Sequence, residues 1–149
     1  MRIIGVIGGS SIPDGIYEKA RLVGRLIAER GYAVISGGLG GVMEAVSKGA
    51  KDGNGLVIGV LPGDSKLEAN PYVDIPIVTG MGEMRNVIIV KSSDVIIAID
   101  GSYGTMTEIA FALKLGKKVV GLDCNLPFPE LEMANSPEDA VNKAVKHLK

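Results

Sequence analysis

Short, uniformly apolar runs alternate with helix-like segments along most of the chain, and this alternation strongly limits the folds open to it. Strands that are apolar throughout are typical of a parallel sheet, because right-handed crossover helices bury both of its faces. We therefore predict an α/β fold, a doubly wound, Rossmann-like three-layer sandwich that forms a single domain over residues 1–149. The runs lie at Ile3–Ile7, Tyr32–Ser36, Leu56–Val60, Val95–Ile99 and Val119–Leu122, with another, Ile75–Val78, inside a connection.

The segments between these runs repeat apolar residues at helical spacing, as Ile16, Ala20, Val23 and Ile27 do. Further helices are predicted near Val42–Lys51, Glu83–Ser92 and Thr105–Leu115, and a last one begins at Ser136. The helix near Glu83–Ser92 carries more apolar residues than one core-facing stripe needs, so we expect a homo-oligomer, a dimer or a tetramer. The polar, turn-rich stretch Pro62–Asp74 is predicted to be a mobile loop able to cover a site.

Composition narrows the classes of partner. Sixteen basic and seventeen acidic residues give a net charge of −1, so nucleic acid and anionic lipid are not the expected partners. A single cysteine, Cys124, and a single histidine, His147, exclude an internal disulfide and the usual zinc sites, so no metal is expected. Without a signal peptide or a membrane-spanning run, the sequence indicates a soluble, cytoplasmic protein with a small-molecule or protein partner.

Glycines cluster directly after three of the predicted strands. In a parallel sheet every strand ends at the same edge, so the three loops should meet at the edge where open α/β sheets bind ligands. Each loop also leads into a helix, whose free N–H groups and dipole attract anions. Tight strand-to-helix turns are the structural alternative for any one loop. We predict a phosphate-binding site formed by Gly8, Gly9, Ser10, Ser11, Gly37, Gly38, Gly40, Gly41, Asp100, Gly101, Ser102, Tyr103, Gly104 and Thr105.

The ligand of these loops is not expected to be NAD in its usual pose. The dinucleotide fingerprint GxGxxG should follow the first strand, and an acidic residue should end the second. Here the first loop reads GGSS and the second strand ends at Ser36.

Arg85 and Glu108 are the candidate catalytic residues, because each begins a helix at the same edge of the sheet. Arginine pairs with phosphate oxygens, and glutamate accepts a proton or stabilises developing positive charge. Both have structural alternatives. Thr105 and Glu108 match a T-x-x-E capping box, and Arg85 fits a solvated or ion-paired position.

Several stretches between Ile3 and Leu122 resemble one known family: GVIGGSS, SGGLGGVMEAVSKGA, VIGVLPG, and the segment from MRNVIIVKSS to GSYGTMTEIAFALKLG. They are similar to the LOG (lonely guy) Rossmann proteins, once named lysine decarboxylases, whose hallmark PGGxGTxxE follows an MxxRK segment. The spacing of the family's arginine and glutamate is kept by Arg85 and Glu108. In the enzymatic branch, the resemblance implies cleavage of the N-glycosidic bond of a nucleoside 5′-monophosphate, with these two residues catalytic.

The sequence departs from that branch at two points. Asp100-Gly101-Ser102 stands for PGG, and Asn86 stands for the lysine. An acidic Asp100 would repel a dianion unless it bound a hydroxyl or pointed away. The chain looks more similar to a sister branch that includes molybdenum cofactor carrier proteins, which bind a phosphorylated pterin.

The favoured interpretation is therefore a binder or carrier of a nucleotide or molybdenum cofactor, with no further cofactor required. The phosphoribohydrolase is the leading enzymatic alternative, and an oligomeric scaffold without catalysis is a third. Lysine decarboxylation is disfavoured, because no lysine shows the features of a pyridoxal-phosphate site.

Overall fold

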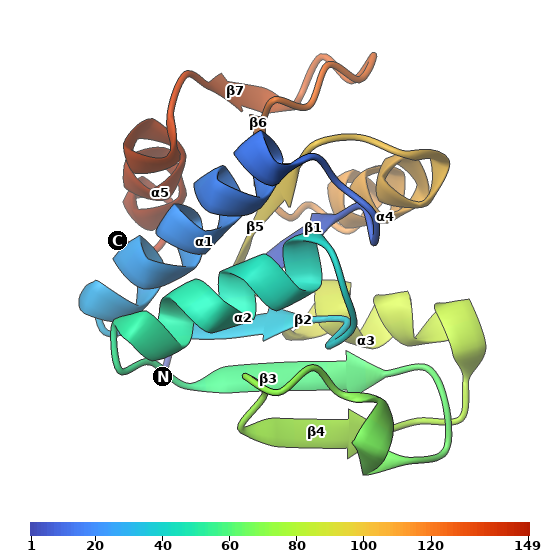
Figure 1. Cartoon of the computed structure of the whole chain (residues 1–149). Helices are drawn as coiled ribbons and strands as arrows, with labels where there is room; N and C mark the ends of the chain where they lie inside the picture. Colours follow the sequence, from blue (N-terminus) through green and yellow to red (C-terminus); the bar gives the residue numbers. More distant parts are fainter.

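Seven parallel strands form the centre of the computed structural model, which describes residues 1–149, and helices cover both faces of the sheet (Figure 1). The strands are β1 (Ile3–Gly8), β2 (Ala33–Ser36), β3 (Val57–Leu61), β4 (Ile75–Val78), β5 (Val95–Ile99), β6 (Val119–Leu122) and β7 (Glu132–Ala134). The helices are α1 (Asp14–Glu29), α2 (Val42–Asp52), α3 (Asn86–Ser92), α4 (Tyr103–Lys114) and α5 (Pro137–Lys146), with 3-10 turns η1 (Lys66–Glu68) and η2 (Gly82–Arg85). The predicted fold class is confirmed.

The strand order is β4-β3-β2-β1-β5-β6-β7, and every neighbouring pair is parallel. From β1 the chain builds outward to β4 and then returns to the other side of β1, where β5 pairs with it. The strand order thus reverses between β1 and β5. In open α/β sheets such a reversal leaves a crevice at the carboxyl ends of the strands, where ligands bind.

The two faces of the sheet are covered by different helices (Figure 1). α1, α2 and α5 pack on one face over a core cluster of 23 buried residues, and α3 and α4 cover the other over a cluster of 12. The second face has less cover because α3 is only seven residues long. No helix of the structure is long and apolar enough to cross a membrane.

Some elements differ from the sequence-based predictions. The helix expected over Glu83–Ser92 is split into the turn η2 and the helix α3, and α4 begins two residues before Thr105. The run Ile75–Val78 is an edge strand, β4, which pairs with β3 on one side only. β7 was not predicted, because its three residues include the exposed Glu132 and Met133 and form no apolar run.

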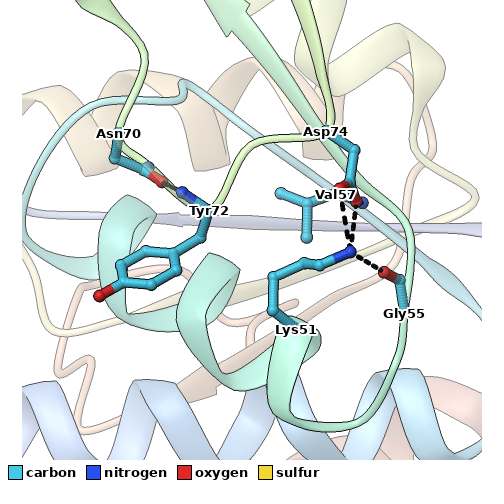
Figure 2. Close-up of polar contacts among 6 residues, drawn as sticks. All are labelled: Lys51, Gly55, Val57, Asn70, Tyr72 and Asp74. Atoms are coloured by element: carbon cyan, nitrogen blue, oxygen red, sulfur yellow. Dashed lines mark hydrogen bonds and ion pairs between the residues drawn. The ribbon is translucent and has the colours of Figure 1, made fainter.

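The connection between β3 and β4, predicted as a mobile loop, is anchored at its end (Figure 2). Asp74 accepts hydrogen bonds from Lys51 Nζ at 2.9 and 3.0 Å and from the Val57 amide at 2.9 Å. Asn70, which is 9% exposed, donates its backbone N–H to Gly38 O at 2.9 Å. The final turn of this connection is therefore fixed to α2 and to the loop after β2, and the exposed residues lie at its tip around η1.

Candidate functional site

A cavity of about 530 Å³ opens at the carboxyl edge of the sheet, around the reversal of strand order. Most of its wall comes from four parts of the chain: β1 with its following loop, the loop after β2, the η2–α3 segment, and the first turns of α4. Met43 of α2 and Pro62 after β3 complete it. The polar side chains that line it are Ser10, Glu83, Arg85, Asn86, Ser102, Thr105, Thr107 and Glu108, and the larger apolar ones include Leu39, Met43, Met84, Val87 and Phe111. The cavity thus combines charged groups with an apolar wall.

Arg85 is a buried cation at this cavity, with 8% of its surface exposed. Its Nε donates to Val60 O at 2.9 Å and its Nη1 donates to Asn86 Oδ1 at 2.7 Å, while Nη2 lies 3.5 Å from Gly37 O. All three acceptors are uncharged oxygens. They fix the orientation of the guanidinium but carry no charge. Burial lowers the pKa of Arg85, and the charges of Glu108 and Glu83 act in the opposite direction. An anionic ligand would supply the direct ion-pair partner that Arg85 lacks.

Gly37 makes room for this arginine. A Cβ atom at position 37 would lie 2.6 Å from both Arg85 Nη2 and Met43 Sδ, which is far inside van der Waals contact. The glycine after β2 is therefore explained by the close approach of the guanidinium and not by a turn conformation.

Glu108 lines the same cavity from α4, and its predicted capping role is wrong. The N-cap of α4 is Ser102, whose Oγ accepts the amide N–H of Thr105 at 3.3 Å and lies 3.0 Å from Thr105 Oγ1. The helix begins earlier than the T-x-x-E pattern indicated, so Glu108 lies in its second turn, beyond the reach of the cap. Its carboxyl group is thereby left free to face the cavity.

The carboxyl group of Glu108 has an unusual protonation equilibrium. Burial raises the pKa of Glu108 to about 7, and the positive charge of Arg85 acts in the opposite direction. The chain has no ion pair between the two side chains, since the bonds of Arg85 go to other groups. At neutral pH this carboxyl group is thus poised to gain or lose a proton, as a general acid or base requires.

The loop after β5 leaves backbone donors open at the N-terminus of α4. The first amides of a helix have no partner within it. Here the amides of Thr105 and Met106 bond back to Ser102, while those of Tyr103 and Gly104 have no acceptor in the chain. Gly104 lines the cavity, and nothing lies within 3.7 Å of a Cβ placed there. This helix start can accept an anion without rearrangement.

The loops after β1 and β2 are closed against each other. The first amide of α2, that of Val42, donates to Gly9 O at 3.0 Å, and Gly41 packs against the same carbonyl. Gly38 O and Leu39 O accept hydrogen bonds from the backbone and side chain of Asn70, both at 2.9 Å. These two carbonyls and the Val42 amide are therefore used inside the chain, whereas the amides of Leu39, Gly40 and Gly41 have no acceptor in it.

The structure brings only some of the predicted site residues to the cavity. Those that line it are Gly8, Gly9, Ser10, Gly37, Arg85, Ser102, Gly104, Thr105 and Glu108. Those that do not are Ser11, Gly38, Gly40, Gly41, Asp100, Gly101 and Tyr103. Asp100 adopts a left-handed backbone conformation, with φ of 61°, just before the loop. Because its side chain does not line the cavity, a bound dianion would be spared the close repulsion that its position in the sequence suggested.

Some residues that line the cavity were not predicted from the sequence. Glu83, Thr107 and Phe111 line the cavity but were not singled out, and Asn86 was noted only as a replacement. The spacing carried a usable signal, because Glu83 precedes Arg85 by two residues and Thr107 and Phe111 flank Glu108 on α4.

The single cysteine does not line the cavity. Cys124 is fully buried, and burial, with the nearby Asp100, raises the pKa of its thiol to about 11, so little reactive thiolate is present at neutral pH. No group of three or more His, Cys, Asp or Glu side chains is arranged to hold a metal ion.

Comparison with known proteins agrees with this architecture. A family model described as the SLOG cluster4 family matches residues 1–148. A protein of Archaeoglobus fulgidus is 49% identical over 95% of this chain and 93% of its own length. The cytokinin riboside 5′-monophosphate phosphoribohydrolase LOG of rice is 33% identical over 81% of this chain. That alignment spans only 54% of the rice enzyme, so the chain covers about half the length of that relative.

Two solved structures are similar over almost the whole chain. The molybdenum cofactor binding protein of Rippkaea orientalis superposes with a TM-score of 0.94 and 37% identity, over 99% of this chain and 98% of its own. The molybdenum cofactor carrier protein of Chlamydomonas reinhardtii gives a TM-score of 0.90 and 35% identity, with 99% of both chains covered. Fold and sequence together define a LOG-like Rossmann protein near the molybdenum cofactor carrier branch. The chain belongs to the SLOG cluster4 family.

Proposed function

We propose that this chain binds a phosphorylated, ring-containing ligand in the cavity, a nucleotide or a molybdenum cofactor, and acts as its carrier. The observation that carries the proposal is that a buried Arg85, which has no ion-pair partner in the chain, and the open amides of α4 meet at one cavity. Both features favour an anion, and the apolar side chains beside them suit a ring. Similarity to the two molybdenum cofactor proteins supports a carrier.

The test is whether the phosphate group determines binding. Calorimetric titration with nucleosides and their 5′-monophosphates should show at least about tenfold tighter binding of the phosphorylated forms, since charge-assisted bonds are lost without phosphate. Arg85→Met keeps much of the side-chain volume and should abolish that difference. Arg25→Met is the matched control, because Arg25 lies on α1 in a surface ion pair with Glu29. Equal binding of nucleosides and monophosphates by the wild type would refute the proposal.

A phosphoribohydrolase is the second candidate function, and Glu108 is the observation that favours it. Cleavage of an N-glycosidic bond passes through an oxocarbenium-like state, which a carboxylate can stabilise while activating water. A cavity-lining carboxyl group with a pKa of about 7 suits either task. We rank it second because Asn86 and Asp100-Gly101-Ser102 replace residues of the enzymatic hallmark.

The two functions differ in one assay. Incubation with purine, pyrimidine and N6-modified nucleoside monophosphates should yield no free base if the chain is a carrier. Release that is lost in Glu108→Gln would establish the enzyme instead. Mass spectrometry of small molecules released from the mildly purified protein would identify the natural ligand in either case.

Assembly into a homo-oligomer is also proposed. Of the apolar residues around α3, Ile89 and Val90 are buried in the core and Val87 lines the cavity, but Met84 is 64% exposed. The edge strand β4 also exposes apolar side chains. A second copy would cover them, and light scattering at micromolar concentration should report a dimer or tetramer; a monomer would remove this proposal.

A further inference from the structure

Glu83 is a second carboxylate at the cavity, and it lies on a different wall from Glu108. Glu83 belongs to η2, which packs against β3, whereas Glu108 belongs to the helix that follows β5. Two strands, β2 and β1, separate β3 from β5 in the sheet. Arg85 is buried and Glu83, two residues earlier on the same turn, is exposed, so a ligand whose phosphate lies against Arg85 and the first amides of α4 would extend outward past Glu83.

No side chain forms a hydrogen bond or an ion pair with the carboxylate of Glu83, although the charge of Arg85 acts on it at longer range. Its neighbour Arg85 directs its hydrogen bonds to Val60, Asn86 and Gly37, and the residues forming ion pairs lie elsewhere. Glu83 is exposed at the mouth of the cavity, beside the apolar side chains of Met84 and Val87. An apolar surface next to a free carboxylate is suited to a flat ring whose edge donates hydrogen bonds.

The chemistry of a carboxylate selects among such rings. An ionised carboxylate only accepts hydrogen bonds, and its two oxygens match two donors placed side by side. A 2-amino-4-oxopyrimidine ring presents that pair, a ring N–H next to an amino group, and guanine and pterin both contain it. Adenine places an acceptor beside its amino group, and hypoxanthine has the ring N–H without the amino group.

We propose that Glu83 is a specificity-determining residue that selects phosphorylated ligands with a 2-amino-4-oxopyrimidine ring by accepting both donors of its edge. This inference rests on the proposed function, because it assumes that the phosphate lies at α4. It narrows the ligand to guanine nucleotides and pterin phosphates.

Guanosine and inosine 5′-monophosphate provide the test, since they differ only in the 2-amino group. The wild type should bind the guanine nucleotide at least about tenfold more tightly, the usual loss when a hydrogen bond to a charged group is removed. Glu83→Gln places a donor opposite a donor and should reduce this ratio to about threefold or less. Glu18→Gln, an exposed change on α1 away from the cavity, should leave the ratio unchanged.

The outcomes distinguish failure of the proposed role of Glu83 from failure of the proposed ligand-binding function. Equal binding of the two nucleotides by the wild type, or an unchanged ratio in Glu83→Gln, would overturn the role of Glu83 while leaving phosphate binding intact. A pterin carrying a phosphate on its 6-substituent distinguishes the two sources of the ring. Tighter binding of the pterin or of the guanine nucleotide supports the inference and identifies the source. If none of the three binds but another nucleoside 5′-monophosphate does, this inference alone fails. If no phosphorylated ligand binds, the proposed function fails, and this inference fails with it.

Discussion

Two glycine-rich loops that look alike in the sequence are packed differently in the fold. The loop after β2 (residues 37–41) and the loop after β5 (residues 101–105) each leave a buried strand and open a helix. The first is tied into the fold, because the amide that opens its helix already has the carbonyl of Gly9 as acceptor. The second leaves the amides of Tyr103 and Gly104 unpaired beside the cavity.

The difference shows what a glycine-rich loop before a helix does and does not predict. The motif predicts a helix start with donors and room for a close neighbour. Whether that neighbour is a ligand or the chain's own backbone depends on what the fold places there. Both loops contribute to the lining of the cavity, but only the first is packed against the loop after β1.

The largest effect on stability is expected from a change that forces the loops after β1 and β2 apart. Gly41 has φ of 63° and ψ of −129°, a conformation that side chains avoid, and a Cβ there would lie 2.2 Å from Gly9 O and 2.5 Å from the carbonyl carbon of Ser10. Gly41→Ala should therefore lower the free energy of unfolding by about 3 kcal/mol. Chemical denaturation measures it. A loss below about 1 kcal/mol would mean that the two loops separate easily.

A smaller effect on stability is expected from replacing Glu108, which lies on α4 after the loop that follows β5. Its pKa is raised to about 7 from 4.5, so the folded state holds a proton that the unfolded state releases between these values. Both states are protonated below about pH 4.5, where no penalty exists. The penalty grows as pH rises and is complete above about 7. Glu108→Gln should then be more stable than the wild type at pH 8, by about 2 kcal/mol after allowance for partial exposure.

Unfolding curves at pH 4 and pH 8 check the sign of this effect. The two proteins should differ little at pH 4 and separate at pH 8. Glu18→Gln, at an exposed position, should follow the wild type at both values. Parallel behaviour of Glu108→Gln and wild type across this range would show that the Glu108 carboxyl group is not desolvated.

The sequence predicted the fold well because the strands are specified locally. Runs such as Val95–Ile99 are apolar at every position, and only a sheet covered on both faces buries them all. β7 was not predicted because it is a strand through its pairing with β6. Its own composition gives no strand signal.

The site was predicted less completely because its decisive contacts join distant residues. Ser102 and Thr105 are both good caps at suitable spacing, so the local pattern does not decide which of them begins α4. The hydrogen bond from the Val42 amide to Gly9 O joins segments more than thirty residues apart, and no sequence motif predicts it. Sequence reasoning therefore located the loops at one edge but could not tell which of them packs against the loop after β1.

An intermediate effect is expected at the cap of the open loop. Ser102→Ala removes the hydroxyl that accepts the Thr105 amide and bonds the Thr105 hydroxyl, and it should lower the free energy of unfolding by about 1 kcal/mol. Thr107→Ala is the matched control, because the exposed Thr107 hydroxyl donates to Gly104 O within the same helix. Denaturation of both variants should rank Ser102→Ala as clearly the less stable. Equal losses would place the start of α4 elsewhere.

The smallest effect on stability is expected at Gly104, the counterpart of Gly41 in the open loop. Its backbone is helical, and a Cβ there would find its nearest atom, Ser102 Oγ, at 3.8 Å, so Gly104→Ala should change the free energy of unfolding by less than about 1 kcal/mol. Binding should respond differently. The added methyl group occupies the approach to the free amides of Tyr103 and Gly104, and a nucleoside 5′-monophosphate should bind about tenfold more weakly. Unchanged affinity would mean that the phosphate lies against Arg85 alone, and that the open loop is free of backbone contacts for a reason other than anion binding.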